Sequence, residues 1–151
     1  MGLMETASAS SVFRGYEYFK SGYVLMKTDI SDHEYKGIVK GSRDNRYNVF
    51  VDLEHPRKSH CDCPHANGRR IVCKHQIALY FSAVPKAAEK YYKDVVRYIE
   101  EEERRQDETD DKVIAYIKSL SKEQLRQALY ETLYDGPDWL FERFVAEHID
   151  L

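Results

Sequence analysis

The stretch Cys61-Asp62-Cys63, followed after nine intervening residues by Cys73-Lys74-His75, uses every cysteine of the 151-residue chain. Three cysteines cannot all close as disulfides, because one is left over. Three thiolates and one imidazole, however, complete the tetrahedral shell of a structural zinc ion. The spacing therefore predicts a bound Zn²⁺ whose ligands are Cys61, Cys63, Cys73 and His75.

Further histidines in the same segment leave the fourth ligand open to an alternative. His55, His60 and His65 are each expected as solvated groups or as groups packed beside the ligands, and His65 is the main rival to His75. Catalytic zinc usually keeps three protein ligands and an open position for water. Four good ligands close the shell here, and the chain contains neither H-E-x-x-H nor the H-x-E and P-C-x-x-C pair of zinc deaminases. The sequence therefore predicts a protein that is not an enzyme.

Strand and turn patterns precede the ligand segment. Strand-like runs cover residues 23–27, 35–40 and 47–53. The last run alternates strictly, with Tyr47, Val49, Val51 and Leu53 toward one face and Asn48, Phe50 and Asp52 toward the other. The turn-forming residues of 41–45 favour a hairpin between the second and third runs.

Helical patterns flank these strands. A short helix is expected over residues 11–20, with Ser10 or Ser11 as its N-cap. A second helix is expected over residues 75–84, starting at the second ligand pair. Together these patterns predict an α+β fold in which a short helix precedes a small zinc-stabilised module of β-hairpin and helix, spanning residues 1–86.

Residues 87–151 are predicted to be an all-helical extension, either separate from the zinc module or packed with it as one unit. The apolar stripe of its first helix stops at an acidic run, and residues 107–111 are expected to break that helix. Residues 121–124 have the Ser-x-x-Gln form of a capping box. A last helix is expected over residues 139–149.

Composition restricts the class of protein. Hydrophobic residues make up 42% and charged residues 32% of the chain, as in ordinary globular proteins. No apolar run approaches the roughly 20 residues that span a bilayer, so no membrane partner is expected. Residues 1–11 lack the basic end and apolar run of a secretory signal. We therefore expect a reducing, cytoplasmic setting (nuclear in a eukaryote), where thiolates are available to a metal.

The net charge of −3 hides two regions of opposite sign. Residues 36–74 contain nine Lys and Arg residues against four acids, whereas residues 100–111 contain eight acids against two arginines. A basic surface around the zinc site favours DNA or RNA as a partner, with a merely solvated face as the alternative. The nucleic-acid contacts are expected at Arg57, Lys58, Arg69, Arg70 and Lys74.

The pattern C-x-C-x9-C-x-H resembles the signature of the SWIM zinc-finger family. Three further stretches are similar to the family: Arg14-Gly15-x-x-Tyr18-x-x-x-Gly22-x-Val24, the paired strands over residues 35–53, and the Cys73-Lys74-His75 start of the helix. The resemblance covers residues 12–84 well and the C-terminal helices loosely. It implies a β-hairpin and a helix that hold one zinc ion through Cys61, Cys63, Cys73 and His75.

The resemblance implies two kinds of function, because SWIM fingers are considered modules for binding DNA or for binding other proteins. They occur in bacterial proteins and attached to helicase-like ATPases, but this chain contains no G-x-x-x-x-G-K-[ST] nucleotide-binding loop. We expect a noncatalytic zinc module that binds nucleic acid. The alternative is an adaptor whose helical region docks on a protein partner or on the remainder of a larger helicase-like chain.

Overall fold

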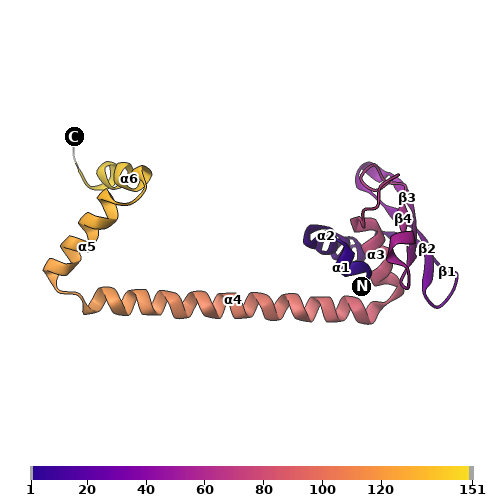
Figure 1. The fold of residues 1–151 in the computed structure, drawn as a ribbon, viewed down its shortest axis with the longest axis horizontal. Coiled ribbons are helices and arrows are strands. Elements are labelled where there is room, and N and C mark those ends of the chain that lie inside the picture. Colours follow the sequence, from indigo (N-terminus) through magenta and orange to yellow (C-terminus); the bar gives the residue numbers. More distant parts are fainter. Residues whose placement is uncertain (1, 150–151) are drawn as a thin grey trace. The chain divides into compact units, whose positions relative to one another are not determined.

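The computed structural model describes residues 2–149 and divides the chain into two compact units, residues 1–96 and residues 97–151 (Figure 1). The boundary falls inside one long helix, α4 (Pro85–Ser119). None of the described helices is both long enough and apolar enough to cross a membrane.

The first unit is an α+β unit, as the sequence predicts. Its elements in chain order are α1 (Leu3–Thr6), α2 (Ala9–Lys20), β1 (Val24–Asp29), β2 (Glu34–Lys40), η1 (Ser42–Asp44), β3 (Arg46–Asp52), η2 (Pro56–Lys58), β4 (His60–Cys61), α3 (Lys74–Ala83) and the start of α4. The four strands form one antiparallel sheet in the order β1-β2-β3-β4. The α3 helix packs on one face of this sheet, and α2 packs on α3 (Figure 1).

The alternation of β3 decides which face of the sheet is buried. The strand predicted over residues 47–53 is confirmed as β3, and Val49 and Val51 are buried while Tyr47 is half-buried, so this face packs on the core. Cross-strand partners lie on the same face, so Cys61, which pairs with Val49, points toward the helices as well. The next residue back, His60, therefore points to the opposite face.

The core of the first unit lies between the sheet and the helices. Ile77, Leu79 and Phe81 from α3 are fully buried. Gly15 on α2 permits the close approach of the two helices, because a Cβ atom there would lie only 2.5 Å from the Cβ of Ile77. The ring of Phe81 contacts an aromatic layer in which its partners are Tyr16, Phe19, Tyr80 and Tyr91. These aromatic residues therefore pack in or against the core.

The N-terminal helical region differs from the sequence prediction. The α2 helix begins at Ala9 rather than at residue 11, and its N-cap is Ser8, whose Oγ accepts a hydrogen bond from the Ser11 N–H at 3.1 Å. A further short helix, α1, was not predicted, because four residues carry no helical period. Leu3 from this helix is buried in the core.

The second unit consists of the C-terminal part of α4 with α5 (Lys122–Tyr134) and α6 (Asp138–His148). The predicted capping box is confirmed: the Gln124 N–H donates to Ser121 Oγ at 3.2 Å, and the Ser121 N–H donates to Gln124 Oε1 at 2.8 Å. Helices α5 and α6 meet through Tyr134 and Phe141, whose ring centroids lie 5.3 Å apart.

The predicted break at residues 107–111 is wrong, because α4 is continuous through it. Local side-chain contacts support the helix where its apolar stripe is missing. Gln106 Nε2 donates to Asp110 Oδ1 at 2.8 Å, and the Thr109 hydroxyl donates to the Arg105 carbonyl at 2.8 Å. Such pairs one turn apart stabilise an exposed helix without a buried face.

Candidate metal centre

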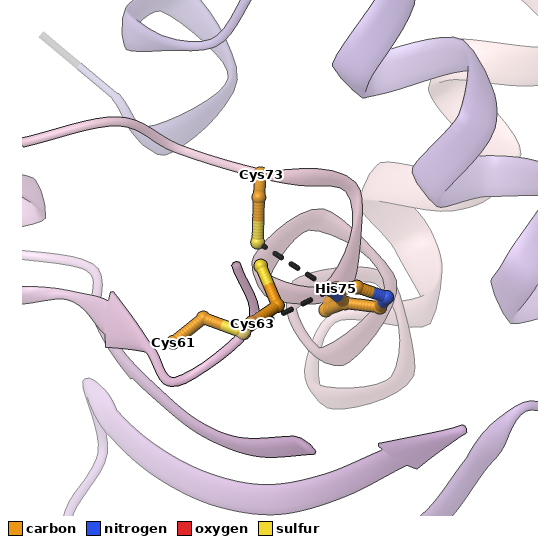
Figure 2. Close-up of side chains that lie close together, drawn as sticks. All are labelled: Cys61, Cys63, Cys73 and His75. Atoms are coloured by element: carbon orange, nitrogen blue, oxygen red, sulfur yellow. Dashed lines mark hydrogen bonds between the residues drawn. The ribbon is translucent and has the colours of Figure 1, made fainter. Parts of the chain in front are cut away.

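The chain brings its three cysteines and one histidine to a single point between the sheet and α3 (Figure 2). Cys61 ends β4, and Cys63 follows two residues later in a turn. Cys73 is the N-cap of α3, and His75 lies in its first turn. One ligand pair therefore follows a strand and the other opens a helix, as the sequence predicts.

The turn after Cys63 and a side-chain clamp fix the first ligand pair. The Cys63 carbonyl accepts hydrogen bonds from the N–H groups of Ala66 and Asn67 at 3.0 and 2.9 Å. Between the two cysteines, the Asp62 carboxylate accepts from the backbone N–H and the side-chain amide of Asn48, both at 2.9 Å. Asp62 therefore ties the C-x-C segment to β3 at a point between the two ligand residues.

The geometry of the four ligand atoms fits a zinc ion. All four lie within 4.8 Å of one another, and all four residues are buried. His75 Nδ1 lies 3.8 Å from Cys61 Sγ and 3.7 Å from Cys73 Sγ. A tetrahedron with Zn–S bonds of about 2.3 Å and a Zn–N bond of about 2.0–2.1 Å separates its corners by about 3.5–3.8 Å. The donor set and its spacing therefore match a closed Cys3His zinc shell.

The pKa values of the three cysteines also indicate that the cluster binds a cation. A hydrogen bond with the Cys61 thiol, together with contacts from His75 and from the Gln76 N–H at the start of α3, lowers the pKa of Cys73 to about 4. The same interaction with Cys73, added to burial, raises the pKa of Cys61, and burial beside Cys73 raises the pKa of Cys63. Three neighbouring thiolates are therefore unfavourable without a metal ion to offset their charge.

Gln76 supports the second ligand pair, a role that was not predicted from the sequence. Its side chain is fully buried, and its Oε1 accepts a hydrogen bond from the Cys73 N–H at 2.7 Å. This bond fixes the backbone of Cys73 at the point where α3 begins. Only the capping position, three residues after an N-cap, marks Gln76 in the sequence.

Replacing Gln76 with leucine is therefore expected to weaken zinc binding by roughly ten- to a hundred-fold. Loss of a group that orients a metal ligand typically has an effect of this size. Competition with a chromogenic chelator measures this affinity. Gln127→Leu is the matched control, because Gln127 is exposed on α5 and its side-chain amide donates to Glu131 Oε1, away from the metal cluster. Equal zinc affinity in the two variants would show that Gln76 has no part in the metal site.

Two tyrosines enclose the histidine ligand. The centroid of the His75 ring lies 4.8 Å from that of Tyr47 on β3 and 5.5 Å from that of Tyr18 on α2. Lys74, which stands between the two helix ligands, donates from Nζ to the Tyr18 hydroxyl at 2.6 Å. Because Lys74 is half-buried and tied to Tyr18, it supports the ligand pair as well as offering a positive charge.

The other histidines lie outside the metal cluster. His60 and His65 are exposed, and neither belongs to the ligand set found among residues 2–149. His60 Nδ1 lies 3.2 Å from the Lys58 carbonyl. His55 Nδ1 lies 3.3 Å from the Asp52 carboxylate. The structure therefore places His75, rather than His65, with the three cysteines.

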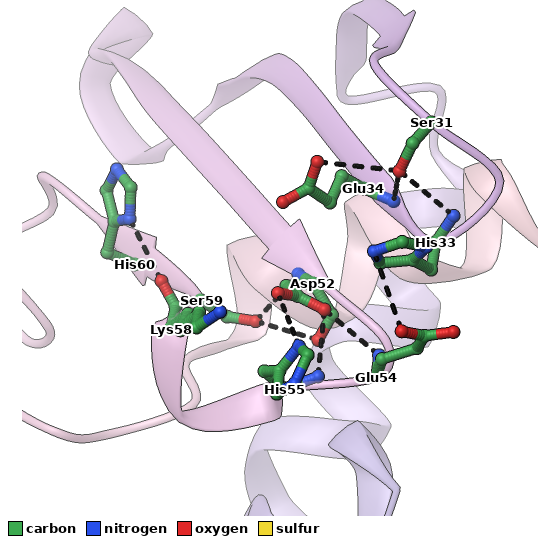
Figure 3. A network of polar contacts seen from close by, with 9 residues as sticks. All are labelled: Ser31, His33, Glu34, Asp52, Glu54, His55, Lys58, Ser59 and His60. Atoms are coloured by element: carbon green, nitrogen blue, oxygen red, sulfur yellow. Dashed lines mark hydrogen bonds and ion pairs between the residues drawn. The ribbon is translucent and has the colours of Figure 1, made fainter.

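A polar network shapes the connection from β3 to β4, where two of the predicted basic residues lie (Figure 3). Asp52 is buried, and its Oδ1 accepts from the backbone N–H groups of Glu54 and His55 at 3.0 and 2.8 Å. Burial alone would raise the pKa of Asp52, but these bonds and the nearby His55 ring hold it below its usual range. The Ser59 hydroxyl closes the loop by accepting from the Asp52 N–H at 3.0 Å.

The structure brings two of the five predicted basic residues to the same cavity. Arg57 of η2 and Arg70, which precedes the second ligand pair, both line one small cavity of about 50 Å³. Lys58 and Arg69 are the exposed sequence neighbours of these two arginines. Within residues 2–149, none of these four side chains has a hydrogen bond or an ion pair. We call Arg57, Lys58, Arg69 and Arg70 the loop cations.

Comparison with known protein families agrees with this geometry. The family model described as SWIM zinc finger matches residues 47–83, from the second residue of β3 to the last residue of α3. All four ligand residues lie inside the match. No curated protein and no solved structure gives a significant match to the chain.

Proposed function

We propose that the region matched by the SWIM zinc-finger model, residues 47–83, is a noncatalytic zinc module that binds DNA or RNA. The observation that carries the proposal is the position of the loop cations. Arg57 and Arg70 come from two separate loops and line the same cavity. Two unpaired guanidinium groups at one place suit the phosphate oxygens of a nucleic-acid backbone.

The zinc ion would fix the positions of these cations relative to one another. Arg57 lies four residues before Cys61, and Arg70 lies three residues before Cys73, so each loop ends at a metal ligand. A metal shell that closes both loops fixes the distance between the two arginines. The role that follows for zinc is structural: it shapes a binding surface instead of performing a reaction.

The noncatalytic part of the proposal rests on the ligand count. Catalytic zinc usually has three protein ligands and keeps one position for water or substrate. Here four buried residues offer ligand atoms to the same point. A metal bound by all four has no open position at which to activate water.

Replacing Arg57 and Arg70 together with glutamine is expected to weaken binding to duplex DNA and to flatten its salt dependence. Each phosphate contact contributes about one unit to the slope of log affinity against log salt, so the slope should fall by about 2. Fluorescence anisotropy with a labelled duplex and a labelled single strand, at about 50 mM and about 200 mM salt, measures both effects.

The matched control removes two arginines from the helical region, as Arg126→Gln with Arg143→Gln. These side chains are exposed on α5 and α6, where they contact Glu123 and Glu147. The control should keep the affinity and slope of the parent chain. Absence of binding to either DNA at low salt, or binding that does not respond to salt, would contradict the proposal.

A second function is favoured by the surface of the helical region. Exposed apolar residues of the second unit include Val113, Ile114, Ile117, Leu125, Leu129, Tyr130 and Trp139. Such a surface is typical of a docking site for a protein partner. This adaptor function replaces the first proposal if the zinc-loaded chain binds no nucleic acid in the titration above.

A further inference from the structure

The face of the sheet opposite α3 carries side chains that the core does not use. Cross-strand pairing places Lys36 beside Phe50, Ile38 beside Asn48, and Phe50 beside His60 on this face. Phe50 and Ile38 are half-buried, while Lys36, Asn48 and His60 are exposed. We call this the outer face of the sheet.

A hollow of about 180 Å³ lies on the outer face. The side chains of Lys36, Ile38, Asn48, Phe50 and His60 contribute to its lining. Lys36 supplies a positive charge to this lining, and the lining contains no carboxylate. Within residues 2–149, Lys36 has no hydrogen bond or ion pair, so its charge is available to a ligand. The hollow is therefore suited to an anion that also carries a flat apolar group.

Two rings form one wall of this hollow. The ring centroids of Phe50 and His60 lie 5.2 Å apart, and the planes are tilted by 33°. The His60 ring is held by the contact of its Nδ1 with the Lys58 carbonyl at 3.2 Å. Aromatic and imidazole rings on an open sheet are the groups on which unpaired bases stack.

Asn48 adds a polar group to the same wall. Its amide nitrogen donates to Asp62 Oδ2 at 2.9 Å, which fixes the orientation of the side chain. The amide oxygen of Asn48 is left to accept a hydrogen bond from the edge of a base. A ring face, a cation and an oriented amide therefore meet within one hollow.

We propose that the outer face binds single-stranded nucleic acid, with one base stacked on Phe50 and His60 and the adjoining phosphate held by Lys36. This inference rests on the proposed function and assigns it a second site and a strand preference. A duplex keeps its bases stacked on one another, so it cannot offer a base to Phe50 without being opened. The outer face therefore selects single strands, whereas the loop cations contact any phosphate backbone.

The zinc centre stabilises the outer face, because both depend on the same short strand, β4. The β4 strand is only two residues long, with Cys61 pointing to the metal cluster and His60 to the outer face. The hydrogen bonds between Asp62 and Asn48 join the residue that follows β4 to β3. Zinc binding at Cys61 therefore fixes His60 beside Phe50.

The test uses the full, zinc-loaded chain with a labelled oligothymidylate of about ten nucleotides, and with a labelled hairpin duplex, by fluorescence anisotropy. Phe50→Leu keeps an apolar side chain but removes the ring face, and is expected to weaken oligothymidylate binding roughly ten-fold or more. Phe50→Tyr keeps the ring face and should bind as the parent chain does. Duplex binding should change little in either variant.

A measurement on the unmodified chain complements these variants. In ¹H–¹⁵N and aromatic NMR spectra, oligothymidylate should shift the resonances of Phe50, His60 and Lys36 before those of residues on α5 and α6. Equal oligothymidylate affinity in the parent chain and in Phe50→Leu, with no shift at these resonances, would overturn the inference while the proposed function stands. If the parent chain binds neither DNA, the proposed function fails, and the inference fails with it.

Discussion

Replacing Cys73 with serine is expected to unfold residues 1–96 at room temperature while the helices beyond residue 97 keep their secondary structure. Apparent binding free energies for structural zinc are about 10–16 kcal/mol, which is as large as the whole stability of a typical domain, about 5–15 kcal/mol. Cys73 is 1% exposed and begins α3, whose side chains form the core. Loss of its thiolate therefore removes the metal and the start of the central helix together.

Metal analysis and ¹H–¹⁵N correlation spectra measure this effect, because dispersed amide signals from the sheet should collapse. The histidines provide a matched pair of variants. His75→Ala should also lose zinc, whereas His65→Ala should keep it, because His65 is exposed and lies outside the cluster. A Cys73→Ser chain that retains its dispersed sheet signals without zinc would show that the metal is not needed for folding.

Replacing Phe81 with alanine is expected to lower the free energy of unfolding of the zinc-loaded first unit by about 3–5 kcal/mol. The Phe81 side chain is 0% exposed. Its ring centroid lies 5.8 Å from that of Tyr16 and 5.5 Å from that of Tyr91, so its removal leaves a cavity where α2, α3 and α4 meet. Urea unfolding followed by circular dichroism, in excess zinc, measures the change.

Phe13→Ala is the matched control for this substitution. Phe13 lies on α2 but is 54% exposed. Its loss should change the free energy of unfolding by less than about 0.5 kcal/mol, as for most surface substitutions. Similar losses for the two variants would mean that the aromatic layer around Phe81 does not form the core.

The ligand set and the strands could be predicted because their signals are local. Cysteine count and spacing identified the metal cluster, and the alternation of Tyr47, Val49 and Val51 identified β3 as a strand with two distinct faces. The start of α3 followed from the second ligand pair. Each of these inferences needs only neighbouring residues and one rule of side-chain periodicity.

The remaining features depend on contacts that no local pattern reveals. The α1 helix is held by the burial of Leu3, and the continuity of α4 comes from polar pairs where an apolar stripe is absent. In the site, the Gln76 bond to the Cys73 backbone is a matter of burial rather than of motif. The pairing of Phe50 with both Lys36 and His60 depends on strand register, which the sequence alone did not fix.

X-ray absorption at the zinc edge of the purified chain tests the closed metal shell most directly. The expected spectrum fits one zinc site with three sulfur ligands at about 2.3 Å and one nitrogen ligand at about 2.0–2.1 Å. His75→Ala should then replace the nitrogen contribution or lose the metal. A parent spectrum that requires fewer than three sulfur ligands, or a water oxygen in the shell, would contradict the closed Cys3His centre on which the structural role of zinc depends.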